Sequence, residues 1–317
     1  MDSKTLIQLR ADLYKKIRSY FQDQSVLEVE TPSLGRSGPT DLHLASMRLS
    51  GDSPQYYLQT SPEFFMKRLL AEGSGDIFSI SRAYREAEVG NRHNPEFSML
   101  EWYRCGFGLS RLMSDVRSLV DSLLTQQTFS ISTYAEFFES CLGVNPHSAS
   151  DTDLLDLVKT RTTVQEDLER ASCLDLLMSE CVEPEMKGQG QAYFLFDFPA
   201  CQAAMAQIGL NAEMQPVARR FELYIDGLEI ANGYLELVSA EEQRIRFEQD
   251  NIARQSAGLE AMPIDEKFLL ALEQVPDCSG VALGLDRLLW LIAREKGLIE
   301  SPQMNLAEVL LFPWHNL

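Results

Sequence analysis

The chain has 317 residues, of which 45% are hydrophobic and 24% are charged, so it can form one large or two modest globular domains with ample core. No apolar run reaches the roughly 18–20 residues of a membrane span, and the N-terminus lacks the apolar core of a signal peptide, so we expect a cytoplasmic protein that makes no membrane contact. The formal net charge of −19 argues against a general nucleic-acid binder, because such affinity comes largely from cations that neutralise phosphates.

The N-terminal part is predicted to combine one long helix with short strands. Apolar residues at helical spacing indicate an amphipathic helix over residues 4–22. Three short strands are expected after it, at residues 26–30, 42–49 and 56–59. Pro32 ends the first of them, because proline cannot donate to a strand ladder. A second helix begins at Ser61, Pro62 and Glu63, whose types suit the N-cap and first turn, and Gly73 ends it.

The middle of the chain contains the stretch FSISRAYREAEVGNRHNPEFSMLEWYR, residues 78–104. It reads as a strand that ends near an arginine, a polar loop, and a second strand. Residues 109–124 form another amphipathic helix, and residues 130–190 are mainly helical. We therefore interpret residues 1–317 as a single domain that carries a mainly helical insertion at about 106–190.

The C-terminal part returns to strands. One is expected at 193–198, and Asp226-Gly227 within 219–240 is a strong signal for a two-residue hairpin. Helices are expected at 240–257 and 265–273, followed by a strand that leads into a helix at Asp286. Strands paired by hairpins, with helices outside them, predict an α+β fold around a mostly antiparallel sheet.

Phe97, Met99, Glu101 and Tyr103 share one face of a predicted strand. An aromatic side chain on such a face can stack a base, and Arg85 before the loop can bind a phosphate through two N–H groups. His93 in the loop could meet a more distant phosphate. No Walker A or GxGxxG loop is present, so ATP would be bound without them. The alternative is that Phe97 and Met99 are core residues and that Arg85 is paired at the surface.

Gly280, Ala282 and Gly284 alternate on another predicted strand, and small side chains there leave a slot where a ligand can approach the backbone. Arg287 follows at a helix start, where anions are favoured. Tight packing of strand against helix would explain the glycines equally well.

Glu229, Asn232 and Glu236 lie close together in the predicted hairpin. Two carboxylates and an amide suit Mg²⁺ bound to ATP phosphates, or an ammonium group of a substrate. In a regular strand Glu229 and Glu236 would point to opposite faces, so we predict a bulge or twist near Asn232-Gly233 that brings both to one side. The alternative is that at least one of these two carboxylates simply lies on a solvent-exposed face.

Together these segments resemble class II aminoacyl-tRNA synthetases. The stretch 26–34 is similar to motif 1, 78–101 to motif 2 and 280–289 to motif 3. The sequences TSPEFFMKRLL, RHNPEFSMLEWYR and GLEIANGYLEL are similar to the lysyl branch. Because we expect no anticodon-binding domain, and because alanine stands at Ala282 where lysyl-tRNA synthetases have glycine, the chain resembles the elongation factor P (R)-β-lysine ligase family.

This resemblance implies a role for each matching residue. Catalytic roles fall to Arg85, Arg287 and Glu229. ATP binding would use these residues together with Glu86, Ala87, Glu88, His93, Asn94, Phe97, Ile230 and Gly284. The amino-acid pocket would comprise Ser61, Pro62, Glu63, Tyr103, Asn232, Glu236 and Ala282, and Mg²⁺ on ATP would meet Glu229 and Glu236. Ala87 stands where motif 2 usually has glutamate, so Glu86, Glu88 or backbone groups alone would have to replace it.

The resemblance further implies an ATP- and Mg²⁺-dependent ligase that forms an adenylate of (R)-β-lysine, or of lysine, and transfers it to a lysine of elongation factor P. Motif 1 implies a homodimer. Two alternatives stay open, a truncated lysyl-tRNA synthetase and a catalytically silent paralogue with a regulatory binding role. The missing anticodon domain, Ala282 and the acidity argue against tRNA, although the acidity also simply keeps a protein soluble.

Overall fold

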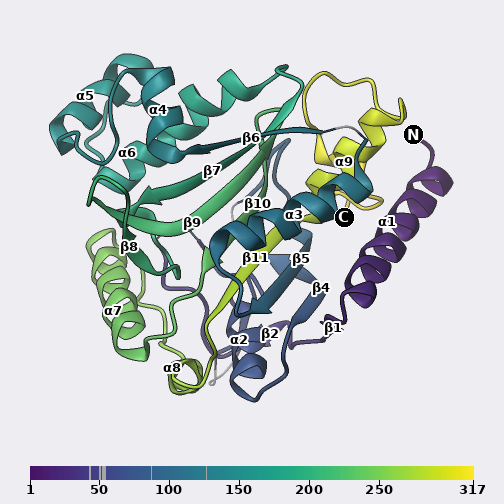
Figure 1. Ribbon diagram of the computed structural model, residues 1–317, viewed down its shortest axis with the longest axis horizontal. Helices are drawn as coiled ribbons and strands as arrows, with labels where there is room; N and C mark the ends of the chain where they lie inside the picture. The colour runs from purple at the N-terminus through teal and green to yellow at the C-terminus, as the bar shows by residue number, and fades with distance from the viewer. Residues whose placement is uncertain (43, 50, 52–54, 87, 126) are drawn as a thin grey trace. The chain divides into compact units, whose positions relative to one another are not determined.

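The computed structural model of the protein describes residues 1–42, 44–49, 51, 55–86, 88–125 and 127–317. The chain forms two compact units (Figure 1). Unit 1 comprises Met1–Phe107, Asp115–Thr125 and Leu237–Leu317, and unit 2 comprises Gly108–Ser114 and Gln126–Glu236. The boundary passes through helix α3 (Leu109–Leu123). That residues 1–317 act as one domain stays a prediction.

Unit 1 begins with the predicted amphipathic helix, α1 (Ser3–Asp23). Asp2 caps it, because its side chain accepts a hydrogen bond from the Thr5 backbone N–H. Its buried stripe is formed by Leu6, Leu9, Leu13, Ile17 and Phe21. Phe21 stacks on Phe78 with ring centroids 4.4 Å apart, so this stripe anchors the helix on the strands of unit 1.

The larger sheet of unit 1 has the strand order β1-β4-β5-β11. Its members are β1 (Leu27–Glu28), β4 (Ile77–Tyr84), β5 (Glu96–Cys105) and β11 (Cys278–Gly284). The β1–β4 pair is parallel and the other two pairs are antiparallel. The mostly antiparallel α+β architecture is therefore confirmed for this unit.

A second, two-stranded sheet pairs β2 (Leu34–Gly35) with β3 (Tyr57–Leu58). The strand predicted at 42–49 is wrong for most of its length. His43 lies outside the described residues, and within the rest only Arg48 forms a β-bridge, with Tyr57. The carbonyl of Ala45 instead accepts the backbone N–H of Glu86, so part of this segment is used to bind the loop of motif 2.

The remaining α-helices described in unit 1 lie where they were predicted. They are α2 (Glu63–Ala71), α7 (Ala240–Ser256), α8 (Glu266–Leu272) and α9 (Leu285–Glu295). Phe64 of α2 stacks on Phe268 of α8 at 4.3 Å. Short 3-10 turns at Leu306–Glu308 and Trp314–Asn316 follow α9 near the C-terminus.

The sheet of unit 2 has the order β10-β9-β7-β6, and β8 pairs with β9. Its members are β6 (Thr128–Thr133), β7 (Gln191–Pro199), β8 (Ile208–Leu210), β9 (Pro216–Ile225) and β10 (Leu228–Leu235). Asp226 and Gly227 both have positive φ, 54° and 71°, as a two-residue hairpin turn requires. The predicted hairpin is confirmed.

Helices of unit 2 fill most of the segment predicted to be helical. They are α4 (Tyr134–Leu142), α5 (Asp151–Arg161), α6 (Arg170–Leu177), a π-turn at Met178–Val182 and a 3-10 turn at Glu183–Met186. A further 3-10 turn at Ala200–Gln202 lies beyond that segment. In Figure 1, α4, α5 and α6 lie together beside β7. Tyr134, Phe138 and Leu174 from these helices share one buried cluster with Leu195 of β7 and Tyr224 of β9.

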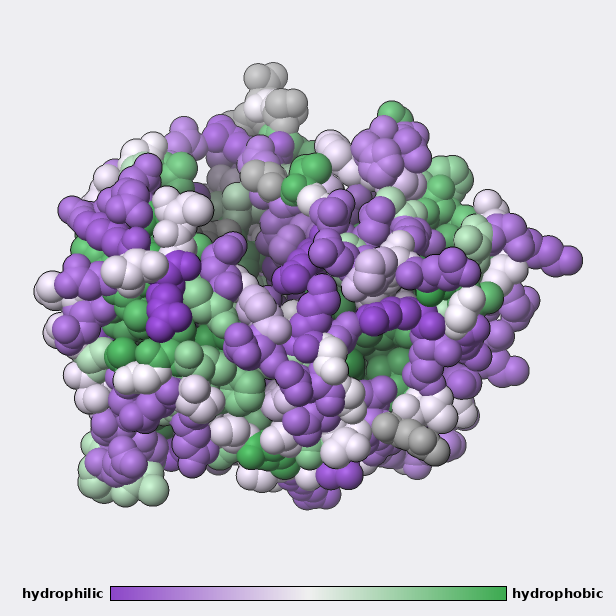
Figure 2. Space-filling view, turned by 90° about the horizontal axis from the view of Figure 1, so that it is seen from above, coloured by the Kyte–Doolittle hydropathy of each residue, from purple (hydrophilic) through white to green (hydrophobic). Residues whose placement is uncertain are grey.

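Hydrophilic side chains dominate the face seen in Figure 2, and apolar residues occur in smaller groups among them. Within the described part of the chain, none of the helices combines the length and the apolar character needed to cross a membrane.

Candidate active site

The predicted face of β5 is flanked by small side chains in both neighbouring strands. On the β11 side, the register pairs Gly280 with Tyr103, Ala282 with Glu101 and Gly284 with Met99. On the β4 side, it pairs Ser79 with Glu101, Ser81 with Met99 and Ala83 with Phe97. Residues paired across strands point to the same face, so small residues border the aromatic and acidic residues of β5 on both sides. The small side chains that the sequence indicated at β11 are thus matched by small side chains on β4.

Glu101 is the centre of a short hydrogen-bond chain on this face. The Ser61 hydroxyl donates to Glu101 Oε2 at 2.6 Å, and the Tyr103 hydroxyl donates to Oε1 at 2.7 Å. Glu101 is only 2% exposed. Sequence analysis placed it on the face but gave it no role, although a lone carboxylate among apolar and small residues was a usable signal.

Ser61 also fixes the start of α2, because its Oγ accepts the backbone N–H of Glu63 at 3.0 Å. Pro62 is the N-cap residue and makes no side-chain capping bond. Glu63 forms an ion pair of 2.8 Å with Lys67, one helical turn later. Lys67 is fully buried. A buried ammonium group needs a carboxylate partner, so the ion pair with Lys67 holds the Glu63 side chain in place.

Arg85 lies next to the aromatic residue proposed to stack adenine. Its guanidinium carbon is 5.0 Å from the Phe97 ring centroid, and its Nη1 is 3.4 Å from Glu88 Oε1. The Arg85 Nε atom is buried and has no hydrogen-bond partner among the described residues. A buried guanidinium N–H without a partner fits an anionic ligand such as a phosphate. Glu86 is exposed, and Ala87 lies outside the described residues.

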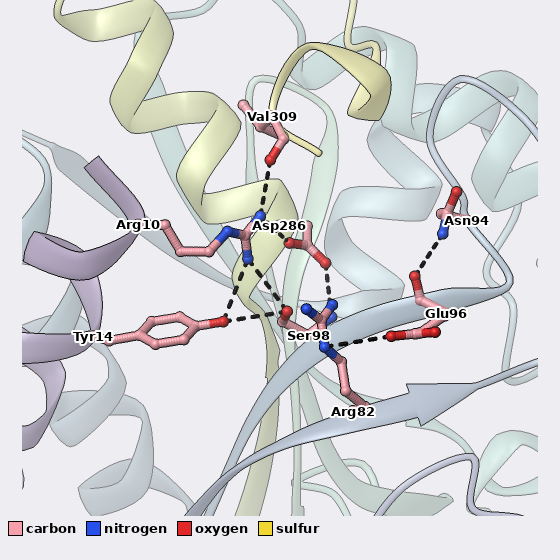
Figure 3. A network of polar contacts seen from close by, with 8 residues as sticks. All are labelled: Arg10, Tyr14, Arg82, Asn94, Glu96, Ser98, Asp286 and Val309. Atoms are coloured by element: carbon pink, nitrogen blue, oxygen red, sulfur yellow. Dashed lines mark hydrogen bonds and ion pairs between the residues drawn. The ribbon is translucent and has the colours of Figure 1, made fainter. Parts of the chain in front are cut away.

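Motif 2 and motif 3 are in contact through the side chains of His93 and Arg287. Arg287 Nη2 lies 2.9 Å from His93 Nε2. Because arginine can only donate, a hydrogen bond between the two requires His93 Nε2 to accept. Asn94 holds the loop in place. Its Nδ2 donates to the Glu96 carbonyl at 2.6 Å (Figure 3). Its Oδ1 accepts the Trp314 backbone N–H at 3.1 Å.

The start of α9 is fixed by a buried carboxylate. Asp286 accepts from Arg10 Nη2 of α1 and from the backbone N–H of Ser98, both at 2.7 Å (Figure 3). Arg10 also donates to the carbonyl of Val309, at 2.9 Å. The contact to Ser98 ties the helix that carries Arg287 to the strand residue that follows Phe97.

In unit 2, a bulge brings the predicted acidic and amide residues to one face. The register of β10 against β9 shifts between Glu229 and Ala231, so the extra residue is Ile230. A bulge was predicted, but its predicted position near Asn232-Gly233 is wrong. Gly233 pairs regularly with Phe221, and its Cα–H side faces the ring of Phe221 so closely that a Cβ would lie 2.4 Å from Cε1. The glycine there makes room for an aromatic ring.

The bulge gives Glu229 the same orientation as Asn232. Glu229 pairs with Tyr224, Asn232 with Glu222, and Tyr234 with Arg220. These six residues therefore share one face, and Glu236, two residues beyond Tyr234, continues the same parity. Glu236 is 1% exposed, and its backbone carbonyl accepts from the Gln207 side chain at 3.0 Å.

Glu222 is an acidic member of this face that sequence analysis missed. Arg220 and the Tyr224 hydroxyl each donate to one of its oxygens. Burial raises the pKa of Glu222 to about 7, with Arg220 opposing the shift and Glu229 adding to it. The Glu222 and Glu229 carboxylates thus repel one another, and a cation that bridged them would relieve that repulsion. Carboxylate oxygens are the ligands that Mg²⁺ takes in proteins, usually one or two of them beside phosphates. No cluster of three or more metal-binding side chains occurs in the ranges that the structure describes.

The comparisons with known proteins agree with these motifs. A family model described as tRNA synthetases class II (D, K and N) matches residues 1–316. The chain belongs to the class II tRNA synthetase family. This class II synthetase is 46% identical over 288 residues to a protein from Haemophilus influenzae strain Rd, covering 88% of each chain. It is 41% identical over 314 residues to one from Hamiltonella defensa, covering 96% of this chain and 93% of the relative. Both relatives are named elongation factor P–(R)-β-lysine ligase.

Proposed function

We propose that this class II synthetase is an ATP-dependent ligase that joins (R)-β-lysine to a lysine side chain of elongation factor P. The observation that carries the proposal is the similarity to ligases of that name at 41–46% identity over about nine-tenths of both chains. The hydrogen-bond chain of Ser61, Glu101 and Tyr103 in unit 1, and the carboxylate pair Glu222 and Glu229 of unit 2, supply groups that such a reaction needs.

In the first step, a carboxylate oxygen of the amino acid attacks the α-phosphorus of ATP, and the bond to pyrophosphate breaks. Arg85 would hold the α-phosphate, and its buried, unpartnered Nε supports that role. Phe97 would stack on adenine. His93 and Arg287, which already lie 2.9 Å apart, would bind the leaving phosphates. Mg²⁺, when bound at Glu222, Glu229 or Glu236, would neutralise phosphate charge.

The amino-acid substrate would be bound by residues of unit 1. Tyr103 and Ser61 fix the oxygens of the buried Glu101 carboxylate, which would receive one ammonium group of the substrate. Ala282, which pairs with Glu101 across the sheet, would narrow the slot by one methyl group. Such a change in shape can favour a β-amino acid over an α-amino acid.

In the second step, the ε-amine nitrogen of the acceptor lysine attacks the carbonyl carbon of the adenylate. AMP leaves, the amine loses a proton to solvent, and an amide forms. No covalent intermediate with the enzyme is needed, so positioning and electrostatics supply the catalysis.

We further propose a cytoplasmic homodimer that does not use tRNA. Three apolar residues near motif 1, Ile7, Leu27 and Leu34, are 45–57% exposed, which suits a surface covered by a second copy. The net charge of −19 disfavours tRNA binding.

The experiment is amino-acid-dependent exchange of pyrophosphate into ATP. We expect exchange with (R)-β-lysine at a higher kcat/KM than with lysine. Arg287→Ala should abolish it, whereas Arg244→Ala, which removes an arginine from an exposed ion pair with Glu266, should leave it unchanged. No exchange with any lysine isomer would favour the silent paralogue. Preference for lysine, with charging of tRNA, would favour a truncated lysyl-tRNA synthetase.

A further inference from the structure

Arg10 of α1 contacts three other parts of unit 1 through its guanidinium group (Figure 3). Nη2 donates to Asp286 Oδ1 at 2.7 Å and to the Val309 carbonyl at 2.9 Å. Nη1 donates to the hydroxyl groups of Tyr14 and Ser98, both at 3.3 Å. The side chain is only 17% exposed. Because a guanidinium group presents its N–H donors in a rigid planar fork, Arg10 links α1 to β5, to the first turn of α9 and to the chain at Val309.

Asp286 connects Arg10 to two residues proposed to bind ATP. While Arg10 occupies its Oδ1 atom, its Oδ2 atom accepts the Ser98 backbone N–H at 2.7 Å. Phe97 directly precedes Ser98, and Arg287 directly follows Asp286. The orientation of this one carboxylate therefore helps to set the spacing between Phe97 and Arg287.

The contact between Asp286 and Ser98 lies where the paired part of the strands ends. β11 pairs with β5 as far as Gly284 and Met99. Beyond this pair α9 begins, and the Asp286 carboxylate continues the attachment to β5. Without Arg10, the carboxylate would keep the Ser98 N–H but lose its charged partner, and almost no solvent reaches it as a replacement. The first turn of α9 would then be held less firmly against β5.

We propose that Arg10 is a positioning residue for ATP binding, which acts through Asp286 to set the spacing of Phe97 and Arg287. This inference rests on the proposed function, because that function assigns adenine to Phe97 and the leaving phosphates to Arg287. Two groups that are already in place bind a ligand more tightly than groups that must be ordered when it binds. The inference adds to the ATP site a residue of α1, a helix that precedes all three motifs.

The test compares Arg10→Ala with Arg18→Ala in steady-state pyrophosphate exchange, which gives kcat and the KM for each substrate. Arg18 is the matched control on the same helix, because it pairs with Glu28 where both side chains are at least 41% exposed. Arg10→Ala should raise KM for ATP by roughly tenfold, as expected for loss of about one hydrogen bond to a charged group. KM for (R)-β-lysine should change less than about twofold, because Glu101 is fixed by its own hydrogen bonds. Arg18→Ala should match the wild type.

Free guanidinium ion separates positioning from a general loss of structure. In Arg10→Ala the small side chain leaves room beside Asp286 for this ion, which has the same planar donors as the missing group. Guanidinium chloride below denaturing concentrations should therefore lower KM for ATP towards the wild-type value, and sodium chloride of equal ionic strength should not.

A merely structural role of Arg10 would give a different kinetic result. It would reduce the folded fraction, which lowers kcat and leaves KM for ATP unchanged. That result would overturn the inference. An equal rise in both KM values, or a raised KM for ATP that guanidinium ion does not lower, would overturn it as well.

Asp286→Asn keeps the inference testable if Arg10→Ala does not fold. Arg10 and the Ser98 N–H both donate, and in this variant one of the two accepting positions becomes an NH2 group that cannot accept. The shape of the side chain is kept, so KM for ATP should rise to a similar degree. An unchanged KM for ATP in Asp286→Asn would refute the inference.

The same exchange assay distinguishes failure of this inference from failure of the proposed function. A wild-type protein without exchange activity would refute the proposed function, and this inference with it. An active wild type with an unchanged KM for ATP in Arg10→Ala would refute the inference alone.

Discussion

The buried pair of Arg10 and Asp286 gives a quantitative test of how unit 1 holds motif 3. Asp286 is 2% exposed, and it accepts two hydrogen bonds of 2.7 Å, from Arg10 and from the Ser98 backbone (Figure 3). Asp286→Ala removes both and leaves the mostly buried Arg10 charge without a carboxylate. Loss of one member of a buried pair costs about 3–5 kcal/mol of unfolding free energy.

Arg10→Met should cost less, about 1–3 kcal/mol, because Asp286 keeps the Ser98 N–H bond and lies in the favourable first turn of α9. The double variant should fall short of the sum of the two losses, since the two residues contact one another. Arg18→Met is the matched control on the same helix, because Arg18 pairs with Glu28 where both side chains are at least 41% exposed. An exposed ion pair contributes little.

Tryptophan fluorescence during urea unfolding is the assay. Trp102, Trp290 and Trp314 are the three tryptophans of the chain, and all lie in unit 1, so the signal reports that unit. If Asp286→Ala and Arg18→Met lower the free energy of unfolding equally, or if the Arg10 and Asp286 losses simply add, the pair does not hold α9 as described.

Three further predictions follow from the packing and charges. Gly233→Ala should cost about 1–3 kcal/mol of unfolding free energy, because its Cβ would press on the fully buried Phe221 ring, and Phe221→Leu in the same chain should recover part of the loss in thermal unfolding. Wild-type stability of Gly233→Ala would contradict this. Phe97→Ala should raise KM for ATP about tenfold or more, as expected for loss of a stacked base, whereas Phe97→Tyr should not; equal KM values would exclude stacking. Lys67→Met should destabilise unit 1 by about 3–5 kcal/mol by leaving Glu63 unpaired, and adding Glu63→Gln should restore stability but not binding of (R)-β-lysine in a calorimetric titration. Restored binding of (R)-β-lysine would exclude Glu63 as a residue that binds this substrate.

Strand parity correctly predicted which residues share a face of β5, because side chains alternate strictly along a regular strand. The same rule indicated that Glu229 and Glu236 need a bulge between them, and one is present. Its position could not be predicted, because Gly233 has the residue type expected at a bulge, whereas Ile230 does not. The glycine is explained only by the Phe221 ring on the neighbouring strand, and that contact depends on register.

The missed residues differ in how far the sequence could have revealed them. Lys67 follows Glu63 by four residues on a predicted helix, so their ion pair was predictable from spacing. Glu101 was on the predicted face and lacked only its partner Ser61, which lies 40 residues earlier. Glu222 depends on the register between β9 and β10, which is fixed only once the bulge at Ile230 is located.

The most direct test of the proposed function is the intact mass of elongation factor P after incubation with this protein, ATP, Mg²⁺ and (R)-β-lysine, with lysine tRNA present as a competing acceptor. The proposed function predicts that elongation factor P gains the mass of one lysyl unit and that the tRNA stays uncharged. Unmodified elongation factor P, with or without charged tRNA, would contradict it.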